Sequence, residues 1–227
     1  DLGSATRCDE YALMCSIALS EFDTRALGIT VGKLVASSTV SEHQITDALR
    51  GCAATQEYRV VVCSVSKHED ARFAALQYIP GTFFSEKVEY VASLNDSLIS
   101  SLVHSNKTRH EVVEYGDKRA CPELAKLGIE AGRLSRYHAD PNIRYEQFEA
   151  LYASWIQNCV DRTAADVVLV AKRDEVLAGV VTVKVDTENE CTRIGLLSVA
   201  EDFQNSTKEF CFTLAGSLRR ANFQNFT

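Results

Sequence analysis

Three successive residues, Arg136, Tyr137 and His138, combine a guanidinium, a phenol and an imidazole. A histidine titrates near neutral pH and can take a proton from an amine through a water molecule. An arginine can pair with a phosphate group through two parallel hydrogen bonds. Taken alone, the same side chains also fit a solvated turn, because exposed His and Arg are common in loops. The three residues are therefore candidates for a binding site, with the solvated turn as the alternative.

The thiols are a second source of chemistry, and the sequence holds eight cysteines and five histidines. No two cysteines have Cys-x-x-Cys spacing and the histidines are scattered, so we expect no metal site. Cys63 and Cys159 lie in apolar patterns typical of a strand and a helix, where a thiol packs as a small hydrophobe. We expect reduced thiols that serve packing rather than catalysis. The cysteines are Cys8, Cys15, Cys52, Cys63, Cys121, Cys159, Cys191 and Cys211.

The overall composition is that of a folded, acidic protein. The chain has 227 residues, of which 46% are hydrophobic, and a net charge of −7. Basic runs are no longer than pairs such as Arg219-Arg220, so we expect no nucleic-acid partner. No stretch approaches the roughly 18 apolar residues of a membrane span, and the N-terminus lacks a secretory pattern. We therefore expect a soluble, cytoplasmic protein that does not bind a membrane.

Hydrophobic periodicity predicts an α/β (α+β) fold in two units, residues 1–105 and 106–227. A polar stretch at 95–109 is expected to link them, and residues 174–179, "DEVLAG", are typical of a hairpin turn region. Ser41 and Gln44 predict a capped helix start. The first unit is expected to have strands at 29–36, 59–65 and 83–94, a helix from Ser41 and a helix at 69–79. The second is expected to have strands at 111–115, 167–172, 176–185, 192–199 and 217–226, and helices at 121–134, 145–158 and 206–214.

The two units share an ending. Each finishes as a helix, a glycine (Gly81 or Gly216) and a strand of antiparallel character. This order predicts that the N-terminal unit is an incomplete copy of the second. The C-terminal strand, Ser217 to Phe226, could pair with the first unit or with another chain, so a homodimer is left open.

Residues 133–160, "RLSRYHADPNIRYEQFEALYASWIQNCV", carry the most specific pattern. Ser-Arg-Tyr, an Asp-Pro turn and a Tyr-x-x-Trp-Ile helix follow in the order that joins the first two helices of Gcn5-related N-acetyltransferases (GNAT superfamily). Residues 20–34 and 193–199, "RIGLLSV", resemble the opening and the central strand of the branch similar to TDP-fucosamine (dTDP-4-amino-4,6-dideoxygalactose) acetyltransferase. The resemblance implies an acetyltransferase fold of mixed, mostly antiparallel sheet flanked by helices. It also implies acetyl-CoA as co-substrate and no metal.

The resemblance implies a place for acetyl-CoA. In this family a bulge in the central strand frees backbone N–H groups for the thioester and pantetheine, and Leu197, Ser198 and Val199 match that place. A glycine-rich pyrophosphate loop should follow, then a helix and a strand, before an Asn-led helix. Gln204 matches the start of that loop, but Asn205 already matches the start of the later helix. We therefore expect a missing segment between Gln204 and Asn205, with a wide gap between their Cα atoms; a true deletion is the alternative.

The resemblance also assigns the acceptor site and raises one difficulty. It places Arg136, Tyr137 and His138 over the acceptor pocket, with His138 as the base. The family's tyrosine acid falls on Phe212, which cannot donate a proton, and the neighbouring Cys211 faces elsewhere on the helix. The implied activity is acetyl transfer to a primary amine, foremost the amino group of a nucleotide-linked deoxyamino sugar. The alternative is a non-catalytic acyl-CoA-binding or regulatory module.

Overall fold

The computed structural model describes residues 15–36, 40–64, 85, 87, 111–188 and 191–206. The chain divides into two compact units, Asp1–Ser85 and Glu86–Thr227, which are described separately. The boundary predicted between residues 105 and 106 lies outside the described residues. Wholly or mostly outside them also lie the elements predicted at 69–79, 83–94, 206–214 and 217–226, the linker at 95–109, and Gly81, Cys211, Phe212 and Gly216.

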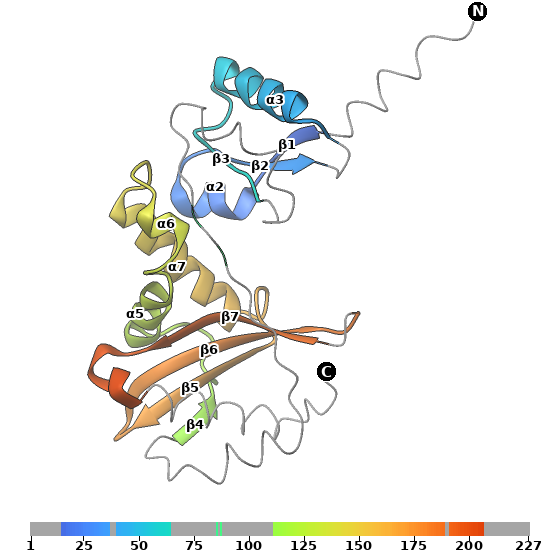
Figure 1. The fold of residues 1–227 in the computed structure, drawn as a ribbon. Helices are drawn as coiled ribbons and strands as arrows, with labels where there is room; N and C mark the ends of the chain where they lie inside the picture. Colours follow the sequence, from blue (N-terminus) through green and yellow to red (C-terminus); the bar gives the residue numbers. More distant parts are fainter. Residues whose placement is uncertain are drawn as a thin grey trace, which may run out of the picture. The chain divides into compact units, whose positions relative to one another are not determined.

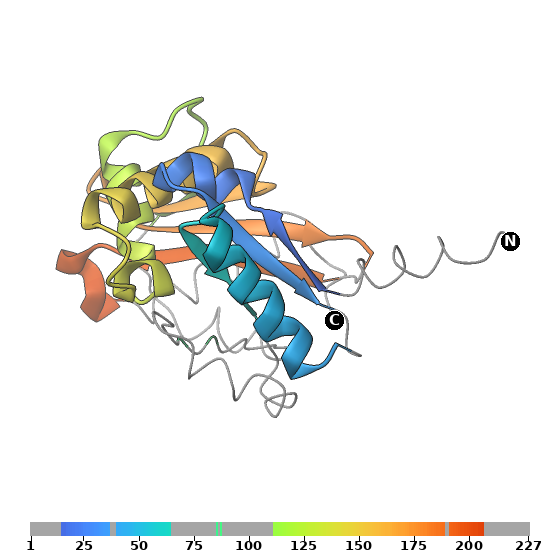
Figure 2. The same ribbon diagram turned by 90° about the horizontal axis from the view of Figure 1, so that it is seen from above.

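The first unit is a three-stranded sheet with helices against it (Figures 1 and 2). The strand order is β1-β2-β3; β1 pairs antiparallel with β2, and β2 pairs parallel with β3. Helix α3 forms the crossover between the two parallel strands, which need a connection of this length. The elements are β1 (Cys15–Leu19), α2 (Glu21–Leu27), β2 (Val31–Ala36), α3 (Glu42–Thr55) and β3 (Val60–Val62).

Local sequence sets the helix ends in this unit. Ser41 accepts a hydrogen bond from the Gln44 backbone N–H, and the Gln44 side chain accepts one from the Ser41 N–H, so the predicted capping box is confirmed. Helix α2 ends at Gly28, whose φ of 65° is in the left-handed region that glycine tolerates best. Strand β1 and helix α2 were not predicted from the sequence, because they are short and lack a clear period.

The second unit is a four-stranded antiparallel sheet in the order β4-β5-β6-β7. Helices α5 and α7 pack against each other and cover one face of this sheet (Figure 1). The fold class predicted from the sequence, α/β with a mixed and mostly antiparallel sheet, is confirmed. The elements are β4 (Glu111–Glu114), α5 (Pro122–Ala131), α6 (Arg136–Ala139), α7 (Tyr145–Val160), β5 (Val167–Arg173), β6 (Val176–Asp186), β7 (Cys191–Val199) and the 3-10 helix η3 (Glu201–Ser206).

The turn between β5 and β6 confirms the predicted hairpin. Asp174 and Glu175 both have positive φ, 50° and 64°. Two successive residues of positive φ are the mark of a type I′ turn, whose twist matches that of the flanking strands. Neither residue is a glycine, so the turn retains backbone strain.

Helices α5 and α7 pack closely against each other and bury apolar side chains. Phe148, Leu151 and Ile156 on α7 are each at most 1% exposed. A Cβ added to Gly128 of α5 would lie 2.8 Å from two carbons of Ile156, so only glycine permits this approach. The two helices are thereby held close to each other. Among the described residues, no helix is both long and apolar enough to cross a membrane.

Candidate functional site

The predicted binding turn is a short helix, α6, packed on α7. The Ser135 hydroxyl caps it by accepting a hydrogen bond from the His138 backbone N–H at 3.4 Å. The sequence predicted a single helix from 121 to 134 and then a turn. In the structure α5 ends at Ala131, and a separate short helix holds the three candidate residues. The cap from Ser135 therefore helps to fix the backbone of the three candidate residues in a helical turn.

The Arg136 guanidinium is fixed against Tyr137. Its Nη2 donates to the Tyr137 hydroxyl at 2.6 Å, and its Cζ lies 4.4 Å from the centre of the Tyr137 ring. Tyr137 is 8% exposed and meets Tyr152 of α7 edge to face, with ring centres 6.5 Å apart. The Nε of Arg136 is buried and has no hydrogen-bond partner among the described residues. A buried donor of this kind is a position at which an anionic oxygen would be favourable.

His138 points into an aromatic row on α7 while remaining exposed. Its ring centre lies 5.0 Å from that of Phe148 and 6.2 Å from that of Tyr145. The row continues to Tyr152 and Trp155, which are stacked at 5.5 Å. Tyr152 and Trp155 therefore lie on one packed face of this helix. The three candidate acceptor residues thus all lie on α6, beside the aromatic side chains of α7.

Strand β7 carries a bulge, as the resemblance predicted for this strand. One residue of β6, Thr182, stands opposite two residues of β7, Gly195 and Leu196. The Leu196 N–H donates to the Thr182 hydroxyl at 2.8 Å instead of to a backbone carbonyl. The bulge lies immediately before Leu197, Ser198 and Val199, not within them. These three residues pair in regular register with Val181, Val180 and Gly179, respectively.

The backbone amides after the bulge alternate in direction. The N–H of Ala200 points to β6, where it donates to the Ala178 carbonyl at 2.9 Å. Successive N–H groups of an antiparallel strand point to opposite edges, so those of Leu197 and Val199 point away from β6. Strand β7 is last in the order of the sheet, and no described strand pairs with that edge.

The side chain of Ser198 has a structural contact. Its hydroxyl donates to the Leu127 carbonyl of α5 at 2.7 Å, in a buried position. This bond ties β7 to the helix layer. The next side chain along the strand, Leu197, points to the other face of the sheet and is 41% exposed. Ser198 therefore orients the strand, and only the backbone of its neighbours is directed to the open edge.

Helix η3 continues directly from β7 and contains Gln204 and Asn205. Because the helix runs through both residues, the gap expected between their Cα atoms is absent, and that prediction is wrong. Whether the gene encodes further residues at this point stays a prediction. The first turn of η3 holds Glu201 and Asp202, whose carboxylates repel a pyrophosphate. Within the described residues this junction is thus not a phosphate cradle.

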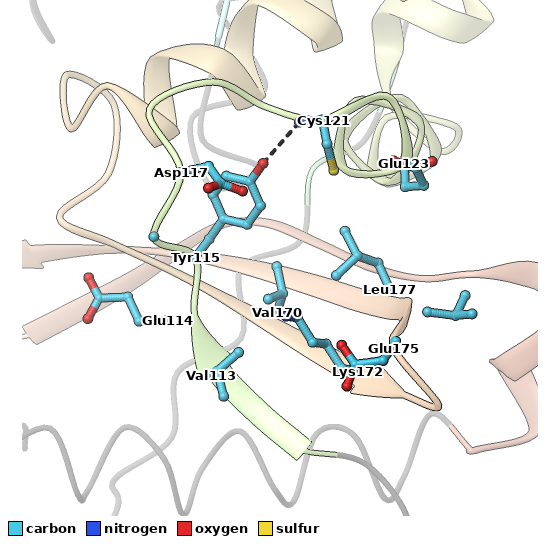
Figure 3. Close-up of a pocket in the computed structure, with 12 residues that line it drawn as sticks. Val113, Glu114, Tyr115, Asp117, Cys121, Glu123, Val170, Lys172, Glu175 and Leu177 are labelled. Carbon is cyan, nitrogen blue, oxygen red and sulfur yellow. Dashed lines mark hydrogen bonds between the residues drawn. The ribbon is translucent and has the colours of Figure 1, made fainter.

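A cleft of about 590 Å³ lies between the N-terminal end of α5 and strands β4 to β6 (Figure 3). Val113, Val170 and Leu177 contribute apolar surface to this cleft. Lys172 also lines it and carries a positive charge. None of the predicted site residues lines it. The carboxylates along it belong to Glu114, Asp117, Glu123 and Glu175. This excess of negative charge makes it a poor receptor for the phosphates of coenzyme A.

Tyr115 closes one side of this cleft and is held by the start of α5. Its hydroxyl donates to the Arg119 carbonyl at 2.7 Å and accepts from the Cys121 N–H at 3.0 Å, the bond drawn in Figure 3. Burial raises the pKa of Tyr115 to about 12. The phenol is therefore a neutral structural link between β4 and α5.

The described part of the chain contains six of the eight cysteines. The six cysteines there are all free thiols. Burial raises the pKa of Cys63 to about 11, which makes it a poor nucleophile. No group of three or more His, Cys, Asp or Glu side chains in these residues could hold a metal ion.

Comparison with known proteins gives a distant structural likeness. No family model matches the sequence, and no curated protein matches it. A solved structure with some similarity belongs to a Desulfovibrio desulfuricans protein described as a member of the GNAT family of acetyltransferases. It shares 15% sequence identity, covers 52% of this chain and 69% of its own, and has a TM-score of 0.34. Agreement this low carries no argument, so the function is inferred from the geometry of the site.

Proposed function

We propose that the protein is an acetyl-CoA-dependent N-acetyltransferase that acts on a primary amine. The observation that carries the proposal is the bulge in β7. It lies in an antiparallel sheet under two helices and is followed by a strand edge to which Leu197 and Val199 direct their N–H groups. An acetyl-CoA enzyme of the resembled family needs such an edge in its central strand.

The chemistry requires few side chains. A neutral amine attacks the thioester carbonyl, an oxyanion forms, and coenzyme A leaves as a thiolate. A backbone N–H at Leu197 or Val199 would stabilise the oxyanion, because a fixed donor near developing charge costs no reorganisation. The thiolate is a tolerable leaving group. Phenylalanine in place of a proton-donating tyrosine at position 212 would therefore slow the reaction without preventing it.

Helix α6 would receive the acceptor. Arg136 has a buried Nε without a partner among the described residues, and a phosphate oxygen of a sugar nucleotide would satisfy it. His138 is exposed beside it and can accept a proton from the amine through water. The substrate class proposed is therefore a nucleotide-linked deoxyamino sugar.

A second candidate function is a non-catalytic acyl-CoA-binding or regulatory module. Two observations favour it: Phe212 stands where the family has its acid, and the first turn of η3 carries Glu201 and Asp202 where a pyrophosphate would need donors. The mass of the purified chain shows whether residues are missing from the sequence between Gln204 and Asn205 or were deleted from the protein. A mass near 25.1 kDa favours the module, and a mass several kilodaltons larger favours the enzyme.

The experiment for the enzyme mixes the protein with acetyl-CoA and a panel of amino-sugar nucleotides and follows the release of free thiol. We expect turnover with at least one of them. Arg136→Gln should raise KM about tenfold or more, since it removes the phosphate partner. Arg133→Gln is the matched control, because Arg133 is exposed and pairs only with Glu130 among the described residues. If none of the amines is acetylated while acetyl-CoA still binds tightly, the proposal of an enzyme fails and the binding module takes its place.

A further inference from the structure

The bulge in β7 depends on a side chain from the neighbouring strand. Thr182 is fully buried on β6, and its hydroxyl accepts the N–H of Leu196, which is 3% exposed. A bulge leaves one residue of a strand outside the ladder, so its N–H needs another acceptor. Thr182 supplies that acceptor at 2.8 Å.

Gly195, the other bulged residue, fits the same hydroxyl. A Cβ added at Gly195 would lie 2.9 Å from Thr182 Oγ1. Contacts this short between a Cβ and a polar atom require one of them to move. A side chain at position 195 would therefore press the hydroxyl away from the Leu196 amide. Glycine here keeps the acceptor in place.

A third residue lies next to the hydroxyl, in the helix layer. Cys159 of α7 is fully buried. Burial raises the pKa of its thiol, and the neighbouring Thr182 side chain opposes that rise. The Thr182 hydroxyl, which accepts from Leu196, still carries a proton that it can direct toward the sulfur. Thr182 thus connects α7, β6 and the bulge of β7.

The bulge decides which amides of β7 face outward. Without the extra residue, the pairing after the bulge would slip by one position and every later residue would turn over. Leu197 and Val199 would then direct their N–H groups to β6. Ser198 would turn away from the Leu127 carbonyl to which it now donates.

We infer that Thr182 is a positioning residue of the acetyl-CoA site, which holds the bulge through the Leu196 amide and so presents the Leu197 and Val199 amides at the open edge of β7. This inference rests on the function proposed above. In the proposed arrangement Thr182 does not touch acetyl-CoA. It affects binding only through the position of the β7 backbone.

The test compares substitutions that keep or remove the hydroxyl. Thr182→Val has nearly the same shape without the acceptor, and Thr182→Ser retains it. Gly195→Ala is a second perturbation, at an exposed residue. It retains the Thr182 hydroxyl, but its Cβ would press that hydroxyl away from the Leu196 amide. The stability control is Val170→Ala, which opens a cavity at a fully buried residue of β5, away from the bulge. Acetyl-CoA affinity is measured by calorimetry, melting temperature by circular dichroism, and the exchange rate of the Leu196 amide by NMR.

We expect Thr182→Val and Gly195→Ala to weaken acetyl-CoA about tenfold or more and to speed exchange of the Leu196 amide at least about tenfold. Thr182→Ser should stay within about twofold in both measurements. Val170→Ala should lower the melting temperature without changing the affinity more than about twofold.

Two results would overturn the inference. One is a Leu196 amide that stays protected in both Thr182→Val and Gly195→Ala. The other is an acetyl-CoA affinity that follows melting temperature alone across all variants, the Val170→Ala control included. If the unsubstituted protein does not bind acetyl-CoA, the proposed function fails. Amide exchange across the same variants then still decides whether Thr182 holds the bulge.

Discussion

Gly132, at the C-terminal end of α5, tests how tightly the helix layer is packed. A Cβ added there would lie 2.5 Å from Cε2 and Cζ of the Tyr152 ring and 2.6 Å from Cδ2. Tyr152 is 4% exposed and touches Tyr137 and Trp155, so its ring has little room to move. We predict that Gly132→Ala is destabilising.

The expected magnitude follows from two opposing effects. Overpacking a core typically costs about 1–3 kcal/mol. At Gly132 the φ of −85° suits alanine, whose smaller unfolded-state entropy returns about 0.4–1 kcal/mol. The net loss in the free energy of unfolding should be about 1–2 kcal/mol. Gly116→Ala is the control in the same unit, because its added Cβ meets nothing within 4 Å; it should be neutral or slightly stabilising.

Urea denaturation measures this loss, and Tyr152→Leu shows where it arises. Leucine removes the ring atoms that the new Cβ meets, so the double variant should recover about 1 kcal/mol relative to the sum of the single changes. Fluorescence gives a second signal. The protein has one tryptophan, Trp155, which stacks on the displaced ring, and its native emission should change in Gly132→Ala. Additive effects within about 0.5 kcal/mol, with unchanged emission, would refute the packing argument.

Three further predictions concern single side chains. Glu175→Gly should raise the free energy of unfolding by about 1 kcal/mol in urea titrations, because glycine relieves the positive φ of the type I′ turn. The pKa of Tyr115 is raised to about 12 by burial, so its stabilisation is present below pH 10 and lost from about pH 10 to 12; Tyr115→Phe should flatten that alkaline loss. The pKa of Asp166 is lowered, first by the Val185 N–H and then by Lys184. Its contribution should therefore disappear as pH falls below about 4, and Asp166→Asn should remove that acid dependence.

Several elements were determined by the sequence alone, because their signals are local. The capping box at Ser41 and Gln44 requires residues three apart. The helix predicted at 145–158 is observed as α7, Tyr145–Val160, because its apolar face repeats at helical spacing. The strands at 167–172, 176–185 and 192–199 were predicted to within one residue at each end. Alternation and apolar runs fix such segments without information from the rest of the chain.

Tertiary structure decided the features of the site. The Arg136 contact with Tyr137 is between neighbours, but the burial of Nε depends on packing of α6 against α7. The bulge at Gly195 and Leu196 depends on Thr182, which stands 14 residues from Leu196 on another strand. A lone glycine and a lone threonine have no periodic signal, and the resemblance placed the amides without showing what holds them. A bulge is a mismatch between two strands, so it exists only after they have paired.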